Sequence, residues 1–197
     1  MPVKISTIRL GSEWFSLAYD HDLRLVANSI PSTSPEESRR SLTNSLTVRR
    51  VKECFESAPD PAIVDKFTSA LDSGIKNTNL NLSYEGIPQF QKRVLLMMTM
   101  IPKGRVATYR SIAAALGKPN AQRAVGNALA RNPFPVIIPC HRVIRSDLSL
   151  GGYSGNRGTK IKESLLVREG VKIQNGRVME RFLLASDMLS YRSSLCP

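Results

Sequence analysis

The stretch TYRSIAAALGKPNAQRAVGNALARN, which runs from Thr108 to Asn132, decides the fold of the second half of this chain. A first helix is predicted over Tyr109 to Leu116, after which the tripeptide Gly-Lys-Pro ends it. Asn120 is suited to cap a second helix that reaches about Arg131. Two short helices around a glycine-containing turn are typical of a helix-turn-helix motif. Because many helical hairpins bind nothing, the pattern alone leaves DNA binding open.

The second of these helices has the composition of a helix that lies close to a nucleic acid. It consists largely of alanine, valine, glycine and leucine, with charges at Arg123 and Arg131. Small side chains would let its backbone approach a duplex, while the arginines would reach phosphates or enter the base stack.

The charge of the chain, +12 in total, is concentrated in the same half. Residues 85–175 carry 15 Lys and Arg against 4 Asp and Glu, whereas residues 1–84 carry 10 of each. A basic half beside a neutral half is typical of a domain that binds a polyanion. A basic surface without any partner would have the same composition.

Downstream, the stretch VIIPCHRVI, Val136 to Ile144, places a cysteine and a histidine side by side after a proline. Neighbours on a regular strand point to opposite faces, so Cys140 and His141 share chemistry only if Pro139 helps to break the strand. Positive charge from Arg142 and Arg145 favours the thiolate form of the cysteine. The residues alone leave two interpretations equally open: an accidental pair, or a nucleophile and its base set on a turn.

The remaining cysteines and histidines indicate neither a disulfide framework nor a metal site. Cys54 is predicted on a helix as a small buried hydrophobe, and Cys196 is the penultimate residue. Three scattered cysteines suggest a reducing compartment. The two histidines, His21 and His141, have no partner at the spacing of metal ligands, and no glycine-rich phosphate loop follows a strand. We therefore expect neither a metal nor a nucleotide cofactor.

The first half of the chain is predicted to form a small strand-and-helix domain. Its expected elements are a β-hairpin from EWFSLAYD (13–20) and DLRLVANSI (22–30), a helix capped by Ser34 with Pro35 and Glu37 that extends to about Ser57, a helix from Asp60 to Gly74, and a short strand LNLSY (80–84). The domain boundary is placed near Gly86, where the charge balance changes. The expected fold class is thus α+β.

Beyond the boundary, a helix with a methionine-rich core face is expected from Pro88 to Ile101, and a final helix from Thr159 to Glu169. Residues 171–197 are expected to form a hairpin and a short helix. No apolar run approaches the ~20 residues of a membrane span. The N-terminus has no signal-peptide pattern.

Taken in order, these motifs resemble the O6-alkylguanine-DNA alkyltransferases, also called methylated-DNA–protein-cysteine methyltransferases. The matching segments are IPKGRVATYRSIAAALG, QRAVGNALARNP, NPFP, PCHRV, GGYSG and REGV, which together cover about residues 85–173. The N-terminal half resembles the family only in shape. The resemblance implies a structural N-terminal domain (1–84), a mainly helical, winged-helix-like catalytic and DNA-binding domain (85–175) and a C-terminal tail (176–197).

The same resemblance implies an activity, direct reversal of O6-alkylguanine damage. The alkyl group of a flipped-out guanine would pass irreversibly and once to Cys140, without cofactor or metal. The partner would be the minor groove of double-stranded DNA, bound by a monomer in the cytoplasm, or in the nucleus of a eukaryote.

The resemblance also implies a role for each matching residue of the site. Cys140 would accept the alkyl group and His141 would act as its base through a water, while Glu169 would hold the other imidazole nitrogen. Asn132 would brace the turn that carries the cysteine, and Tyr109 would donate a hydrogen bond to the guanine ring. Taken alone, Asn132 is better explained as a turn residue before a proline. Glu169 stands near a helix C-terminus, where the helix dipole disfavours an acid, and this favours a functional role.

Two further sets of residues follow from the resemblance. Arg123 would enter the duplex in place of the flipped base. The residues expected against DNA with it are Thr108, Arg110, Ala121, Ala124, Gly126, Asn127 and Ala128. The residues expected to form the base pocket are Val143, Tyr153, Ser154 and Gly155.

Three other functions fit parts of the pattern. A lesion-binding protein without repair activity would lack the cysteine, which is present here as Cys140. A regulator that senses alkylation would need a further module, and residues 1–84 show no basic DNA-reading pattern. A cysteine hydrolase using Cys140 and His21 would turn over an ester or a peptide.

Overall fold

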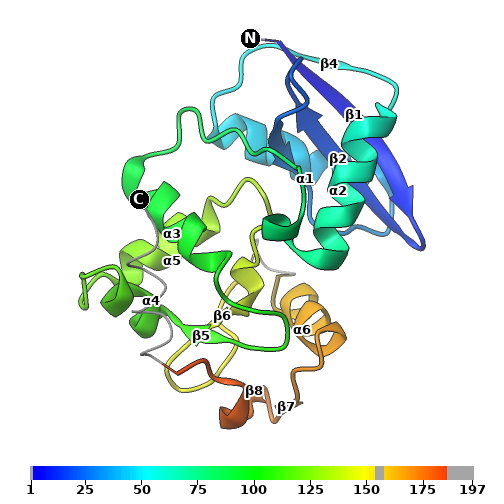
Figure 1. The fold of residues 1–197 in the computed structure, drawn as a ribbon. Helices are drawn as coiled ribbons and strands as arrows, with labels where there is room; N and C mark the ends of the chain where they lie inside the picture. The colour runs from blue at the N-terminus through cyan, green and yellow to red at the C-terminus, as the bar shows by residue number, and fades with distance from the viewer. Residues whose placement is uncertain (1, 154–157, 186–197) are drawn as a thin grey trace. The chain divides into compact units, whose positions relative to one another are not determined.

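The computed structural model of the chain, drawn in Figure 1, describes residues 2–153 and 158–185. The chain divides into two compact units. The first consists of the residues up to Ile87 together with Arg131–Ile138, and the second of Pro88–Ala130 and the residues from Pro139 onward. The mixture of helices and small sheets confirms the α+β class. Within the described part of the chain, no helix has the length and apolar character needed to cross a membrane.

The first unit contains a four-stranded sheet with the order β3-β2-β1-β4. Its strands are β1 (Val3–Leu10), β2 (Glu13–Tyr19), β3 (Leu25–Asn28) and β4 (Cys54–Glu56). The predicted hairpin is confirmed, since β2 and β3 pair antiparallel. Strand β1, which was not predicted, pairs antiparallel with β2 and parallel with β4.

Helix α1 (Pro35–Val48) begins where it was predicted and ends much earlier. Ser34 caps it by accepting a hydrogen bond from the Glu37 backbone N–H at 3.2 Å. The expectation that it reaches Ser57 is wrong, because residues 54–56 pair with β1 as the edge strand β4. The prediction for Cys54 is wrong for the same reason: it lies exposed on this edge strand instead of buried on a helix.

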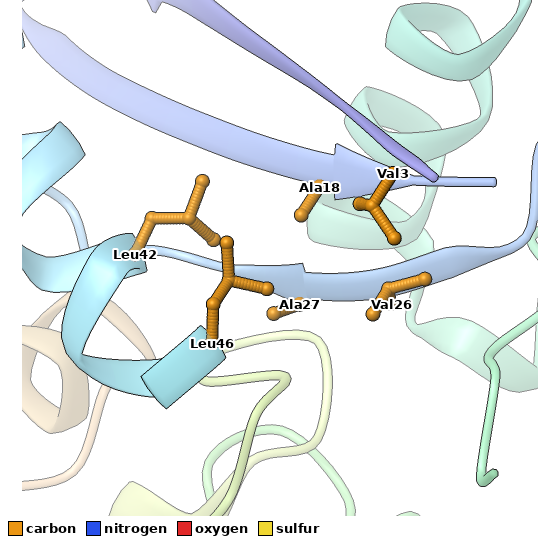
Figure 2. Close-up of a cluster of buried hydrophobic side chains, with 6 residues drawn as sticks. All are labelled: Val3, Ala18, Val26, Ala27, Leu42 and Leu46. Atoms are coloured by element: carbon orange, nitrogen blue, oxygen red, sulfur yellow. The ribbon is translucent and has the colours of Figure 1, made fainter. Parts of the chain in front are cut away.

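Helices α1 and α2 (Pro61–Ser73) pack against different side chains of the sheet. Leu42 and Leu46, one turn apart on α1, belong to the apolar cluster drawn in Figure 2. The other members of this cluster are Val3, Ala18, Val26 and Ala27. On α2, the Phe67 ring meets the Phe15 ring edge-on, with 5.5 Å between the centroids. This packing explains why both amphipathic helices form in the first half of the chain.

The last part of the first unit comes from two extended segments. Residues 80–84 do not form the predicted strand, because only Leu82 makes an isolated bridge, to Leu25. The segment 131–138 is joined to the sheet through Asn28, whose side-chain amide donates to the Pro135 carbonyl at 2.9 Å. Residues far apart in the sequence therefore complete this unit.

The second unit contains the predicted helix-turn-helix. Its elements in chain order are α3 (Gln89–Met98), β5 (Ala107–Thr108), α4 (Tyr109–Ala115), α5 (Gln122–Ala130), β6 (Val143–Ile144), α6 (Gly158–Arg168), β7 (Ile173–Gln174) and β8 (Arg177–Val178). Two short 3-10 turns, η2 (Cys140–Arg142) and η3 (Glu180–Phe182), also belong to this unit, whereas the turn η1 (Ile75–Asn77) belongs to the first. Helix α5 begins at Gln122, so Asn120 lies before the cap position for which it was predicted.

The predicted C-terminal hairpin is confirmed as β7 and β8, which pair antiparallel. The turn between them, Asn175-Gly176, has positive φ at both residues, as a two-residue turn of type I′ requires. The following residues belong to the same unit, since the Leu184 N–H donates to the Val106 carbonyl at 2.7 Å.

Candidate active site and DNA-binding helix

The cysteine and the histidine of the quoted stretch lie on a turn and not on a strand. Cys140 and His141 are the first two residues of η2, directly after Pro139. Successive side chains of a 3-10 turn are about 120° apart, so both can face the interior of one unit. The side chains are buried, with exposed fractions of 6% for Cys140 and 0% for His141.

The chain enters this turn through an unusual conformation. Val136 has a φ of 71°, a left-handed value that a β-branched residue rarely adopts. Asn132 closes this part of the first unit, because its side-chain amide donates to the Ile138 carbonyl and its amide oxygen accepts from the Phe134 N–H, both at 3.0 Å. Its side chain therefore holds together the loop that precedes the cysteine in the sequence.

Glu169 holds the histidine. It directly follows α6, and its Oε1 lies 2.9 Å from His141 Nε2. Arg142 binds the same carboxylate at two points, with Nε 2.9 Å from Oε2 and Nη2 2.7 Å from Oε1. The imidazole, carboxylate and guanidinium thus form one connected group.

The protonation state of this group follows from burial and hydrogen bonding. Burial alone would raise the pKa of Glu169, but the hydrogen bonds from His141 and Arg142 outweigh it and hold that pKa at about 2. Burial lowers the pKa of His141, and the bond to Glu169 offsets this only in part. His141 is therefore a neutral imidazole that donates from Nε2, which leaves its Nδ1 as an acceptor. That Nδ1 is buried and makes no hydrogen bond to the described residues.

A buried lysine lies beside the cysteine turn. Lys162 of α6 is fully buried, and its Nζ donates to the carbonyls of Val143 at 2.6 Å and Leu150 at 2.5 Å. Burial lowers the pKa of this ammonium to about 8, and the charge of Cys140 acts in the opposite direction. The cysteine thus shares a low-dielectric interior with a cation, an arrangement that favours a thiolate.

Two tyrosines complete the surroundings of the thiol. Burial and then the Cys140 charge raise the pKa of Tyr109 and of Tyr153, so both phenols remain neutral hydrogen-bond donors. The ring of Tyr109 fits between two glycine backbones. A Cβ added at Gly126 would lie 3.9 Å from its Cε1, and one added at Gly151 would lie 3.6 Å from its Cε2.

Helix α5 presents an exposed face of small residues. Arg123, Ala124 and Asn127 are exposed on it, and Gly126 is half-buried. Before the helix, Ala121 is half-buried. The assignment of Ala128 to this face needs correction, because it is buried and its carbonyl accepts a hydrogen bond from Gln91 of α3 at 3.3 Å.

The other expected residues are placed as follows. Arg110 is exposed on α4, and Thr108 caps that helix by accepting from the Ser111 N–H at 3.0 Å. Val143 is buried on β6. Ser154 and Gly155 lie outside the described residues. Among the residues that the structure describes, no three His, Cys, Asp or Glu side chains gather as metal ligands.

Comparison with known proteins identifies the family. The family model described as "6-O-methylguanine DNA methyltransferase, DNA binding domain" matches residues 89–171. The methylated-DNA–protein-cysteine methyltransferase of Methanothermobacter thermautotrophicus is 42% identical over 123 residues, which are 60% of this chain and 68% of the relative. The mouse protein of the same name is 34% identical over 164 residues, or 77% of this chain and 72% of the relative. The chain belongs to the methylated-DNA–protein-cysteine methyltransferase family.

Solved structures of methyltransferases have the same fold as this chain. The O6-methylguanine-DNA methyltransferase of Pyrococcus kodakaraensis KOD1 matches with a TM-score of 0.66 and 28% identity, over 86% of this chain and 99% of the other. A Mycobacterium tuberculosis structure, described as OGT in complex with DNA, matches with a TM-score of 0.63 and 29% identity, over 85% and 93%.

Sequence reasoning missed two features of this methyltransferase's site. Lys162 was not singled out, although it stands at helical spacing from the buried Leu165 and Leu166, and this position on the apolar face was the available signal. The two-point contact of Arg142 with Glu169 had no signal, because 27 residues separate them.

Proposed function

We propose that this methyltransferase repairs O6-alkylguanine in double-stranded DNA by moving the alkyl group to Sγ of Cys140. The observation that carries this assignment is the buried Cys140 on the η2 turn beside a neutral His141 that Glu169 holds at 2.9 Å. Nucleophile, base and orienting acid are the three parts that an activated thiol requires.

The proposed chemistry is a displacement at the alkyl carbon. His141 Nδ1 takes the Cys140 proton through a water, and the thiolate attacks the carbon attached to guanine O6. The new S–C bond forms as the C–O bond breaks, and the bonding electrons leave with the guanine. The Tyr109 phenol donates a hydrogen bond to the leaving ring, and the proton gained by His141 returns to the guanine. The products are a thioether and a neutral guanine.

The proposed protein acts once. A thioether has no easily displaced group, so neither water nor a neighbouring side chain regenerates the thiol. The cysteine is consumed, and one protein molecule repairs one lesion. No methyl donor, metal or nucleotide enters this scheme.

We propose that the exposed face of α5 enters the minor groove. Arg123, Ala124 and Asn127 are exposed there, and small side chains suit that narrow groove. Arg123 fills the space left by the flipped nucleotide, whose extrusion costs a few kcal/mol. Binding through phosphates is largely independent of sequence and weakens as salt rises.

The remaining assignments are also proposals. Val143 and Tyr153 line the pocket of the flipped base, and Asn132 braces the loop before the cysteine. Catalysis and DNA binding belong to residues 85–175, and residues 1–84 support them. The protein acts as a monomer in the cytoplasm, or in the nucleus of a eukaryote.

Intact-mass spectrometry tests the proposed function. The protein is mixed with a duplex that contains O6-methylguanine, and we expect the mass to rise by a single methyl group that maps to Cys140. The Cys140→Ala variant should gain nothing, while Cys54→Ala should behave like the wild type. Tight binding without a mass change would contradict the transfer, and turnover of an ester or peptide would favour a cysteine hydrolase instead.

A further inference from the structure

Arg142, which directly follows the cysteine and the histidine, makes contacts at three of its nitrogens. Its Nε and Nη2 bind the two oxygens of Glu169 at 2.9 and 2.7 Å. Its Nη1 donates to the Ile101 carbonyl, beyond the end of α3, at 2.6 Å. This planar fork fixes the carboxylate in position and in rotation, which a single contact would not do.

One carboxylate oxygen serves two donors. Glu169 Oε1 accepts from His141 Nε2 at 2.9 Å and from Arg142 Nη2 at 2.7 Å. Its negative charge is therefore divided between the imidazole and the guanidinium. An unshared carboxylate in a buried site would attract a proton to the histidine much more strongly.

The charges that face His141 come from every element around it. Glu169 after α6 is the carboxylate, and the cations are Arg142 of η2 and Lys162 of α6, both of which lower the pKa of His141. Cys140 adjoins it on η2. With Arg142 present, the ionised Glu169, the guanidinium and the neutral imidazole sum to zero charge. Without Arg142 the same group would be negative and would bind a proton more strongly.

We infer that Arg142 is a positioning residue for alkyl transfer, which orients Glu169 at two points and keeps His141 a neutral base by sharing the carboxylate. The inference rests on the proposed function, in which His141 Nδ1 takes the proton of Cys140. Arg142 itself touches neither the thiol proton nor the alkyl group in that scheme. The alternative role is a purely structural link from α6 to the end of α3.

The charge state of His141 separates these two roles. A structural link would slow transfer by the same factor at every pH. A residue that keeps His141 neutral would, when removed, raise the pKa of His141. The unprotonated base would then be lost at a higher pH, so the acidic limb of the rate profile would move upward.

Nitrogen-15 NMR of the histidine rings reports the charge state of His141 without any alkyl transfer. The chain contains two histidines, and a His21→Gln variant assigns both. In the wild type at pH 7 we expect His141 to be neutral with its proton on Nε2. In Arg142→Met we expect the midpoint for imidazolium formation to rise by about one pH unit or more, as for loss of a charge within ~4–6 Å.

Two further variants complete the design. Arg142→Lys keeps the positive charge and loses the fork, so its midpoint should stay near that of the wild type while transfer slows at all pH values. Arg105→Met is the matched control, because Arg105 Nη1 also donates to a backbone carbonyl of this unit, that of Arg181 at 2.7 Å. It should change neither the midpoint nor the rate.

The outcomes separate the two proposals. An unchanged His141 midpoint in Arg142→Met, with slowing that is uniform in pH, would overturn the role of Arg142 and leave alkyl transfer intact. If wild-type Cys140 gains no methyl group in the mass assay, the proposed function fails, whatever the NMR shows. Should Arg142→Met not fold, a shift in the Arg142→Lys midpoint as large as about one unit would by itself contradict the inference.

Discussion

The two units of this methyltransferase differ in what they bury. The polar side chains buried in the first unit are neutral: Ser6, Ser16, Asn28, Ser29, Ser32 and Ser38. Three of these side chains bond one another, since Ser38 Oγ lies 2.8 Å from Ser16 Oγ and 2.9 Å from Ser29 Oγ. The second unit buries His141 and Lys162 and, in large part, the ionised Glu169.

This difference indicates which unit is organised for chemistry. Neutral hydroxyls that satisfy one another cost little to bury and help to define one packing arrangement. Ionisable groups cost several kcal/mol to remove from water, and their pKa values move as a result. A protein that fully buries His141 and Lys162 in one unit accepts lower stability there in exchange for reactive groups at neutral pH.

The largest effect should come from the base of the second unit. His141→Gln should slow single-turnover transfer to Cys140 by about 10²–10⁴-fold, the usual contribution of a general base. His21→Gln, which removes the exposed histidine of the first unit, should leave the rate unchanged. Equal slowing in both variants would remove the contrast between the units.

Core truncation in the first unit should affect stability and leave chemistry alone. Leu42→Ala should lower the free energy of unfolding by about 2–5 kcal/mol, since it opens a cavity in the cluster of Figure 2. The rate of methyl transfer per folded molecule should not change. Val48→Ala, at a side chain that is 58% exposed on the same helix, is the control and should cost little by urea denaturation.

Removing the buried Lys162 of the second unit should raise stability and slow methyl transfer, the opposite of core truncation in the first unit. The pKa of Lys162 in the folded state is about 8, against 10.5 for a free lysine. The unfolded chain therefore binds more protons between these values, and stability contributed by this group rises from about pH 8 to pH 10.5.

Lys162→Met should remove that rise and increase the free energy of unfolding at pH 7 by up to about 3 kcal/mol. Urea denaturation at pH 7 and at pH 10 measures it, with Lys66→Met of α2 as the control. Transfer to Cys140 should slow in the same variant. A loss of stability at pH 7 would show that the Lys162 ammonium stabilises the interior, and would contradict the idea that buried ionisable groups lower the stability of the second unit.

The smallest effect should concern DNA alone. Arg123→Ala should slow repair of a duplex by about tenfold, or ~1.4 kcal/mol, and should hardly change reaction with free O6-methylguanine. Arg93→Ala removes an exposed arginine of α3 and controls for net charge. Equal slowing with both substrates would contradict the role of Arg123.

The sequence predicted the elements whose signals are local. The start of helix α1 was marked by its Ser34 cap, and the hairpin expected within residues 171–197 was found as β7–β8. Strand β4 was missed because Cys54 pairs with Val3 across some fifty residues, and no local pattern reports that pairing. The length of α1 and the exposure of Cys54 were wrong as a consequence. Strand β1 was missed although it pairs locally with β2 across the Gly11-Ser12 turn.

For the candidate site, the sequence predicted the reactive residues but not their buried surroundings. Short motifs singled out Cys140, His141 and Glu169, since family sequences place these residue types in a fixed order. The motifs did not reveal that Lys162 points inward, because a lysine on a helix is usually solvated and its carbonyl partners lie 12 and 19 residues away. Ala128 was assigned to the DNA side because composition does not distinguish the two faces of α5.

The discontinuity of the first unit has a consequence during protein synthesis. Asn28 bonds Pro135, so the N-terminal unit is finished only when a segment made more than a hundred residues later has emerged. At translation rates of 5–20 residues per second, the interval is roughly 5–20 s. For most of that time all four strands of the sheet are present, but the Asn28 side chain lacks its acceptor on Pro135. The syntheses of the two units therefore overlap. The first unit, although it is begun first, cannot be completed until the helix-turn-helix of the second unit has also been synthesised.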